Sequence, residues 1–549
     1  MSVQHEGLAV VPEETARVAR AAFPRGCLAI RLRDELGVVF TDEQFAGLFP
    51  VRGRPAWSPG RLALISVLQF AEGMSDRQAA DAVRARIDWK YALGMELTDP
   101  GFDFSVLSEF RGRLISGGAE QDLLDSVLRT AAGAGLLGRG GRQRTDSTHV
   151  LTSARMVNRL ELVGEVLRSA LNALAAADSA WMSGHVRPEW LDRYARRWED
   201  FRLPKSPNGR VGLAETIGAD GMEVLRSVFA PGAPPGLRWL PRVELLRQVW
   251  VQQYWVEDGT VRQRTSKEMP PGARRIVSPF DPECRAGVKR DTNWDGYKVH
   301  LTETCDESGP HLITCVLTTA SPGSDYDAVP LVHQALAERE LLPDEHLVDT
   351  GYVSAGNLAG ARCDHGVELI GPTMPDNGWQ TEEGAGFTVA DFTIDWDNQR
   401  VTCPNGAVST RWATERAKGA DVIRVQFSRR DCGPCPERPR CTRASIPRRR
   451  MTLRGDREEF EALQRARAQQ NTDEWLGRYQ ARQGIEGTIS QAVRAFGLRR
   501  SRYRGHAKTH LQHVLTAAAV NFTRLDAWLT GTPLALTRVT PLGRLRLAA

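Results

Sequence analysis

Two alternating runs near the middle of the chain set the strongest limit on its fold. The runs WDGYKVHLTETCD (294–306) and HLITCVLTTAS (311–321) are rich in β-branched residues and separated by a short turn. Such alternation is typical of half-buried strands, so we predict that they pair. AVPLVHQALAEREL then indicates a helix, and EHLVDTGYVSAGNLAGAR a strand ending at Asp349, a turn and a helix. Together these patterns predict an α/β protein.

The N-terminal part of the chain is predicted to be helical. Ser58 and Pro59 begin one helical pattern, Ser75 and Gln78 have the spacing of a capping box, and Ser105 is a predicted cap of a third helix. Three short helices with tight turns resemble helix-turn-helix architecture, in which one helix enters the major groove. A small helical bundle without a DNA role is the alternative. The Gly-rich segment 131–143 separates this region from the rest.

Composition limits the class of protein. With 549 residues, the chain is expected to form roughly three or four units. Its 41% hydrophobic and 25% charged residues are ordinary for a soluble globular protein, and its net charge of +5 says little about partners. The N-terminus has no basic segment followed by a long apolar one, and the longest apolar run, LALISVLQFA, is too short to span a bilayer. We therefore expect a cytoplasmic protein without a membrane partner.

A segment near the C-terminus, RYQARQGIEGTISQAVR (478–494), aligns polar side chains. At about 100° per residue, a helix would place Tyr479, Arg482, Glu486 and Val493 on one face. A plain surface ion pair between the Arg and the Glu is the alternative interpretation. Two glycines, 484 and 487, weaken the helix by about 1 kcal/mol each relative to Ala. We interpret them as permitting close approach to DNA or to the strand that carries Asp146.

Several motifs resemble those of bacterial insertion-sequence transposases of the DDE class. The spacing of Tyr479, Arg482 and Glu486 is similar to the tyrosine-arginine-glutamate-lysine signature of that family. TDSTHV and LVDTGYVSA resemble its two aspartate motifs, and RSRYRGHAKTHLQHVLTAAAVNFTRL (500–525) resembles the segment after the glutamate. Residues 31–59, 73–97 and 278–300 also resemble parts of the family. The likeness covers roughly residues 25–527, with the motifs in the family's order.

The resemblance implies a fold and a reaction. It implies a ribonuclease H-like core (140–530) with a helical insertion (about 155–245) and a β-rich, Cys-containing insertion (about 375–450). An all-helical DNA-binding domain (1–130) would precede this core, and a tail (531–549) would follow it. Asp146, Asp349 and Glu486 match the catalytic triad, whose hard oxygen donors suit two Mg²⁺ or Mn²⁺ ions. The implied reaction is cleavage of transposon ends and their joining to target DNA, by a homodimer associated with the bacterial nucleoid.

One position departs from the family pattern. The expected lysine falls at Val493, and the adjacent Arg494 is the predicted substitute. Two other functions remain open: a catalytically inactive DNA-binding regulator of transposition, and a metal-dependent nuclease. The presence of all three acids favours the enzyme.

Basic runs and a cysteine cluster complete the candidate sites. Residues 494–508 and 438–457 are rich in arginine, which favours contacts with DNA phosphates, although solvated loops are the alternative. Tyr479, Trp294 and Trp379 are candidates for stacking on an extruded base. Of the nine cysteines, four cluster around a C-x₂-C pair, so either a structural zinc site or reduced thiols is predicted. The predicted DNA-binding residues are Tyr479, Arg482, Arg494, Arg499, Arg500, Arg502 and Arg504, and the predicted zinc ligands are Cys403, Cys432, Cys435 and Cys441.

Overall fold

The structure is a computed structural model that describes most of the chain. It describes residues 10–533 except positions 54, 200–202, 290, 291, 377, 383, 385, 418 and 471. Most of the predicted tail, residues 534–549, lies outside the described residues. Over the described part, none of the helices has the length and apolarity that crossing a membrane requires.

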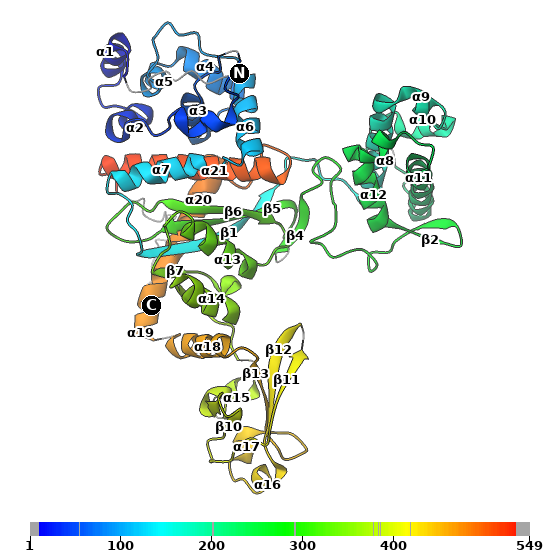
Figure 1. Cartoon of the computed structure of the whole chain (residues 1–549), viewed down its shortest axis with the longest axis vertical. Helices are drawn as coiled ribbons and strands as arrows, with labels where there is room; N and C mark the ends of the chain where they lie inside the picture. The colour runs from blue at the N-terminus through cyan, green and yellow to red at the C-terminus, as the bar shows by residue number, and fades with distance from the viewer. Residues whose placement is uncertain are drawn as a thin grey trace, which may run out of the picture.

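A mixed sheet forms the centre of the molecule (Figure 1). The strand order is β6-β5-β1-β7-β8, with β4 pairing the other end of β5. β1 is antiparallel to β5 and parallel to β7, and β7 is parallel to β8. The predicted strand pair is confirmed as antiparallel β5 and β6. The strands are β1 (Arg142–Leu151), β4 (Arg285–Lys289), β5 (Thr292–Thr304), β6 (Ile313–Ala320), β7 (Glu345–Leu347) and β8 (Glu368–Ile370).

Helices cover both faces of this sheet. Adjacent residues of β6 point to opposite sides, because Val316 joins the main core with α20 and α21, whereas Leu317 packs against the cluster of α13 and α14. The predicted helix at 328–337 and the strand-turn-helix around Asp349 are both confirmed. The elements are η4 (Asp325–Asp327), α13 (Ala328–Ala337), η5 (Thr350–Tyr352), α14 (Ala355–His365), α18 (Arg457–Gln469), α19 (Asp473–Gln480), η7 (Ala481–Gln483), α20 (Gly484–Phe496) and α21 (His506–Leu529).

The N-terminal region is helical, as predicted. Ser58 caps its helix by accepting from Arg61 N, and Ser75 and Gln78 form the predicted capping box. The predicted cap at Ser105 is wrong: Ser105 is the first residue of its helix, and its N–H donates to Asp103 Oδ1 (2.9 Å). The elements are α1 (Glu13–Ala22), α2 (Leu28–Leu36), η1 (Glu43–Leu48), α3 (Pro59–Ala71), α4 (Asp76–Ala85), α5 (Ile87–Leu93), α6 (Ser105–Gly117) and α7 (Asp122–Gly133).

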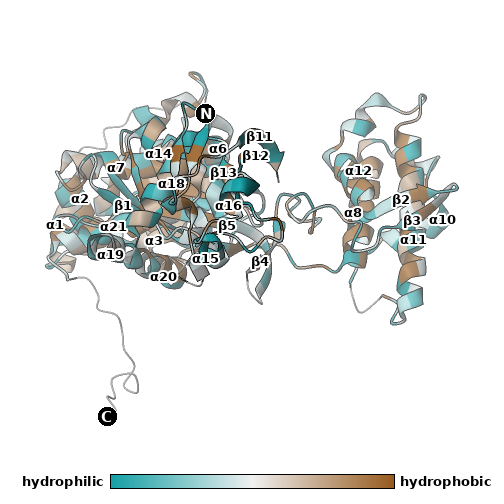
Figure 2. Cartoon of the chain, turned by 90° about the horizontal axis from the view of Figure 1, so that it is seen from below, coloured by the Kyte–Doolittle hydropathy of each residue, from teal (hydrophilic) through white to brown (hydrophobic). Residues whose placement is uncertain are grey.

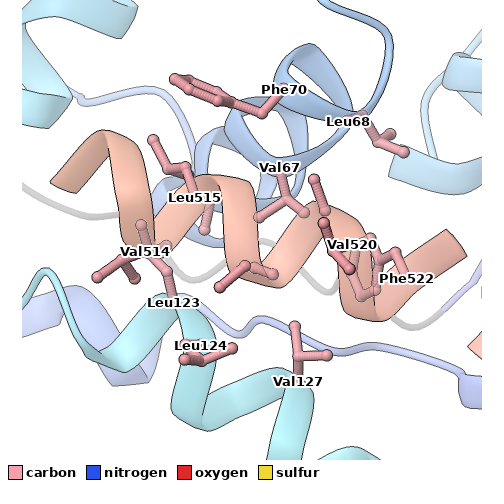
Figure 3. Packing of buried hydrophobic residues seen from close by; sticks show 14 of the residues in the cluster. Val67, Leu68, Phe70, Leu123, Leu124, Val127, Val514, Leu515, Val520 and Phe522 are labelled. Atoms are coloured by element: carbon pink, nitrogen blue, oxygen red, sulfur yellow. The ribbon is translucent and has the colours of Figure 1, made fainter. Parts of the chain in front are cut away.

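The C-terminal helix α21 joins the N-terminal helices to the sheet. Its side chains Val514, Leu515 and Phe522 are buried among residues of α3 and α7 (Figure 3). The same apolar cluster includes residues of β1, β5 and α20. Arg31 of α2 adds a bidentate pair to Asp526 of α21 (2.6 and 2.8 Å). The first and last parts of the chain therefore share one hydrophobic core.

Two further modules have cores of their own. A helical bundle between β1 and β4 buries a separate apolar cluster and stands apart from the sheet in two views (Figures 1 and 2). It contains α8 (Arg159–Ala177), α9 (Ser179–Ser183), α10 (Pro188–Tyr194), α11 (Pro207–Val228), η3 (Pro235–Trp239), α12 (Pro241–Gln253), β2 (Tyr254–Glu257) and β3 (Thr260–Gln263).

The second module is β-rich and lies between β8 and α18, with its own cluster around Phe427. Its largest part is the antiparallel sheet β11-β12-β13. The elements are α15 (Trp379–Glu382), η6 (Val389–Asp391), β9 (Thr393–Asp395), β10 (Arg400–Thr402), β11 (Arg411–Ala417), β12 (Ala420–Gln426), α16 (Arg429–Cys432), α17 (Arg438–Cys441) and β13 (Arg450–Arg454). The domain boundaries implied by the resemblance remain predictions.

Candidate active site

Strand pairing places Asp146 and Asp349 side by side. In the parallel pair of β1 and β7, Arg144 lies opposite Leu347. Each aspartate is two residues further along its chain, so the two acids reach the same level on strands about 4.8 Å apart. Asp146 Oδ1 accepts a hydrogen bond from Ser147 N (2.7 Å), and Asp349 Oδ1 accepts one from Gly351 N (2.6 Å). Backbone donors thus orient both carboxylates.

The segment that carries Glu486 is helical but changes its winding. Tyr479 lies in α19, Arg482 in the 3₁₀ turn η7, and Glu486 in the first turn of α20. A 3₁₀ turn winds more tightly than an α-helix. Tyr479, Arg482 and Glu486 therefore do not follow the regular 100° spacing of one α-helix, on which the predicted single face was based. Tyr479 stacks on Trp475, with ring centroids 4.7 Å apart, and burial raises the pKa of its hydroxyl.

Arg482 lies between the three predicted acids. Its Nη2 is 2.8 Å from Asp146 Oδ2 and 3.8 Å from Asp349 Oδ2, and its Nη1 is 3.1 Å from Glu486 Oε1. The side chain is only 12% exposed, whereas that of Glu486 is 67% exposed. Arg482 Nε is buried and has no hydrogen-bond partner among the described residues. One guanidinium therefore gathers carboxylates from β1, from the turn after β7 and from α20.

A buried ionic network fixes α20 against the sheet. Glu303 on β5 is fully buried and pairs with Arg144 Nε on β1 (2.7 Å) and with Arg524 Nη1 on α21 (2.6 Å). Thr488 of α20 donates to the second oxygen of Glu303 (2.6 Å). Arg144 also donates to the carbonyl of Ala481 in η7 (2.5 Å). The network thus sets where the helical segment carrying Arg482 and Glu486 crosses β1.

Gly484 is required by this contact. A Cβ at Gly484 would stand 2.1 Å from Arg144 Nη1, whereas a Cβ at Gly487 would meet nothing within 4 Å. Of the two predicted reasons for these glycines, close approach to the strand that carries Asp146 therefore holds for Gly484. Gly487 is exposed on the solvent side of the helix.

A fourth carboxylate, which the sequence did not indicate, lies beside Asp349. Asp325 Oδ1 accepts hydrogen bonds from Lys298 Nζ (3.0 Å) and Ser147 Oγ (3.2 Å). A Cβ at Gly351 would stand 2.9 Å from Asp349 Oδ1 and 3.2 Å from Asp325 Oδ2. The absence of a side chain at Gly351 therefore leaves room for Asp349 and Asp325 to approach the same backbone position.

The predicted basic residues surround the end of β1 in different ways. The loop between α20 and α21 runs beside Leu151, whose N–H donates to Arg499 O (2.8 Å). Arg499 Nε donates to Thr148 (2.8 Å), and Arg502 donates to Met74 O (2.9 Å). Arg502 therefore contacts the N-terminal helices. The side chains of Arg494, Arg500 and Arg504 are exposed.

The other aromatic candidates are engaged in packing. Trp294 is 4% exposed and lies against His149, and the guanidinium of Arg443 lies 4.0 Å from the ring centre of Trp379. Val493 packs against the main core.

The predicted ligands differ in how they are arranged. Within the described residues, no group of three or more His, Cys, Asp or Glu side chains is arranged to hold a metal ion. The three acids have the hard oxygen donors that suit a divalent cation, but in this structure they surround a guanidinium. The four predicted zinc ligands line one cavity together with Phe427 and Arg449, and all four are free thiols.

Comparison with known families supports the class of protein that these features define. Residues 402–526 match the family described as "Transposase DDE domain", and residues 18–113 match the family "Transposase domain (DUF772)". The first match includes Glu486, α20 and most of α21, and the second spans most of α1–α6. A search of curated proteins finds no match.

The protein is an enzyme of the polynucleotidyl transferase and endonuclease type. More specifically, it is an insertion-sequence transposase of the DDE class, as the sequence predicted. Transposases of this class bind DNA and generally use divalent metal ions.

The contact at Gly484 gives a prediction for stability. We expect Gly484→Ala to lower the free energy of unfolding by about 1–3 kcal/mol, because Arg144 cannot move aside without breaking its buried pair with Glu303. The matched variant Gly487→Ala should raise it by up to about 1 kcal/mol through helix propensity alone. Chemical denaturation of both variants would measure this, and equal effects would contradict the proposed contact.

Proposed function

We propose that Asp146, Asp349 and Glu486 are the catalytic carboxylates of this transposase. The observation that carries the proposal is their convergence on Arg482 from three separate elements. Three acids that share one small volume repel one another unless a cation lies between them. A divalent ion and a guanidinium both meet that need, so a site built to hold a metal is expected to recruit a basic side chain without it.

The sheet supports a ribonuclease H-like core as part of this proposal. The order β6-β5-β1-β7-β8, with β5 antiparallel and β7 and β8 parallel to β1, puts Asp146 on β1 and Asp349 directly after the adjacent strand β7. The glutamate comes from a helix packed across β1. This agrees with the placement that the family resemblance implies for each acid.

The roles of the residues follow from their contacts. Two Mg²⁺ or Mn²⁺ ions at the three carboxylates would activate a water or a 3′-hydroxyl and stabilise the leaving oxygen of the cleaved strand. The backbone donors of Ser147 and Gly351 hold the aspartates for this task. Arg482, once released from the acids, is placed to contact a phosphate of the bound strand. The exposed side chains of Arg494, Arg500 and Arg504 would hold the DNA backbone beyond it.

Removal of the acids should separate chemistry from binding. We expect Asp146→Asn, Asp349→Asn and Glu486→Gln each to reduce cleavage of transposon ends and strand joining roughly a thousandfold or more, since each removes a metal-binding charge. End binding, measured by gel shift, should change little. Glu474→Gln is the matched control, because Glu474 is an exposed acid of the same helical segment.

The products distinguish this proposal from its alternatives. Joined strands indicate transposition, nicks alone would indicate a nuclease, and binding without either product would indicate an inactive regulator. Full cleavage by Glu486→Gln would contradict the assignment of the triad.

The position of Arg482 predicts competition with metal ions. We expect Arg482→Gln to lower the melting temperature in EDTA, because three carboxylates lose their shared cation. The same variant should bind Mn²⁺ about tenfold more tightly, since the ion no longer displaces a guanidinium. Thermal shifts across a Mn²⁺ titration without DNA measure both effects. Arg494→Gln, an exposed control, should behave like the wild type; an unchanged Mn²⁺ response in Arg482→Gln would refute the competition.

We also propose that Cys403, Cys432, Cys435 and Cys441 bind a structural zinc ion. Zinc favours four thiolates, and these thiols line one cavity of the β-rich module. The pKa of the Cys441 thiol is raised by burial and by the neighbouring Cys432, Cys403 and Cys435. Asn405 donates to Cys435 Sγ (3.6 Å).

Metal analysis tests the zinc proposal. Purified protein should contain about one zinc per chain, and the double variant Cys432→Ser/Cys435→Ser should contain almost none. Cys363→Ser, at an exposed thiol outside the cluster, is the control and should keep its zinc. Wild-type protein without zinc after purification in zinc-containing medium would contradict the site. The homodimer implied by the resemblance remains a prediction.

A further inference from the structure

The sheet β11-β12-β13 has two chemically different faces. Ile423 and Val425 of β12 and Met451 and Leu453 of β13 alternate inward and belong to the apolar cluster of the β-rich module. The residues between them point to the other face, as the period of two in a strand requires. The register shows which residues neighbour each other on that outer face. Gln426 lies opposite both Arg411 and Arg450, and Arg424 lies opposite Thr452.

The outer face is rich in arginine. Arg411, Arg424, Arg450 and Arg454 are all exposed on it, from all three strands. Strands about 4.8 Å apart and residues about 3.3 Å apart give a patch of roughly 10 by 13 Å. We call these four side chains and the surface around them the arginine face.

Few acids balance these charges. Glu415 is shared by Arg411 (3.3 Å) and Arg424 (3.6 Å), and Glu459 lies 3.6 Å from Arg454. All of these side chains are more than a third exposed, so solvent weakens the pairs. Beside the face, the pKa of Arg448 is lowered by burial and then by the nearby charges of Arg450, Arg429 and Arg411. The surface therefore carries surplus positive charge.

The chemistry of the face favours the phosphate backbone of DNA as its partner. Guanidinium groups match phosphate oxygens with paired donors, and a lattice of four across three strands fits a backbone that presents a charge every few ångströms. Within the described residues of the three strands, the apolar side chains on the outer face are Val422 and the small Ala413, Ala417 and Ala420, so the face lacks the large anchors typical of a protein partner. A duplex held here would be recognised without regard to sequence.

We propose that the arginine face of β11, β12 and β13 is a second DNA-binding surface, separate from the candidate active site, which holds the phosphate backbone of a DNA duplex. The proposal rests on the proposed function, since it concerns the DNA on which the transposase acts. It assigns the β-rich module a role in DNA binding in addition to its predicted zinc site.

Substitution of the whole face tests the proposal. The variant Arg411→Gln/Arg424→Gln/Arg450→Gln/Arg454→Gln leaves the buried face of the sheet intact. Binding to a duplex without transposon ends is measured by fluorescence anisotropy, without added Mg²⁺ or Mn²⁺, across 50–300 mM salt. We expect the affinity near 100 mM salt to fall at least about tenfold, and the slope of log K against log salt to fall by about 3 to 4, because up to four phosphate contacts are lost.

A matched variant controls for net charge. Arg187→Gln/Arg196→Gln/Arg226→Gln/Arg247→Gln removes four exposed arginines from the helical bundle. If this control loses as much affinity and slope as the arginine-face variant, or if the arginine-face variant binds like the wild type, the proposal is overturned. Binding without added Mg²⁺ or Mn²⁺ does not require catalysis, so this result stands independently of whether the triad assignment holds. Circular dichroism and melting curves verify that both variants are folded.

Discussion

The buried pairing of Glu303 with Arg144 and Arg524 is the constraint on which the site depends. Glu303 is fully buried, and removal of one partner would leave an uncompensated charge in the core. The three residues come from β5, β1 and α21, and Thr488 adds α20 to the same carboxylate. A buried ion pair often contributes little net stability, but it requires one geometry. Here that geometry fixes the start of α20 over β1, next to Asp146.

Helix α21 connects the candidate active site to the N-terminal helices. It supplies Arg524 to the ionic network and packs its apolar side chains between the sheet and helices α3 and α7. A displacement of the N-terminal helices by DNA would therefore act on the helix that anchors α20. Arg502, which reaches Met74 O from the loop before α21, provides a second connection between the two regions.

Much of the fold could be predicted from periodicity, but the contacts that define the site could not. Alternation identified β5 and β6, and the capping residues Ser58 and Ser75 identified two helices, because these signals are local. Spacing and family resemblance predicted that Asp146, Asp349 and Glu486 form one site. The pairing of Glu303 with Arg144 and Arg524 could not be predicted from the sequence. A charged residue inside an alternating strand does not show which distant side chains neutralise it. The central position of Arg482 depends on the 3₁₀ turn η7, and no pattern in the sequence predicted that turn.

The packing of Val493 gives a structural reason for the departure from the family pattern at this position. At about 100° per residue, Val493 lies within about 20° of the direction of Glu486, two turns further along α20. Glu486 is exposed, whereas Val493 packs against the main core, so the same stripe of the helix is open at one end and covered at the other. A lysine at 493 would have to bury its stem and extend its ammonium to solvent. Arg494 lies one residue around the helix and is exposed, which fits the prediction that it substitutes for the lysine while Val493 keeps its apolar contact with the core.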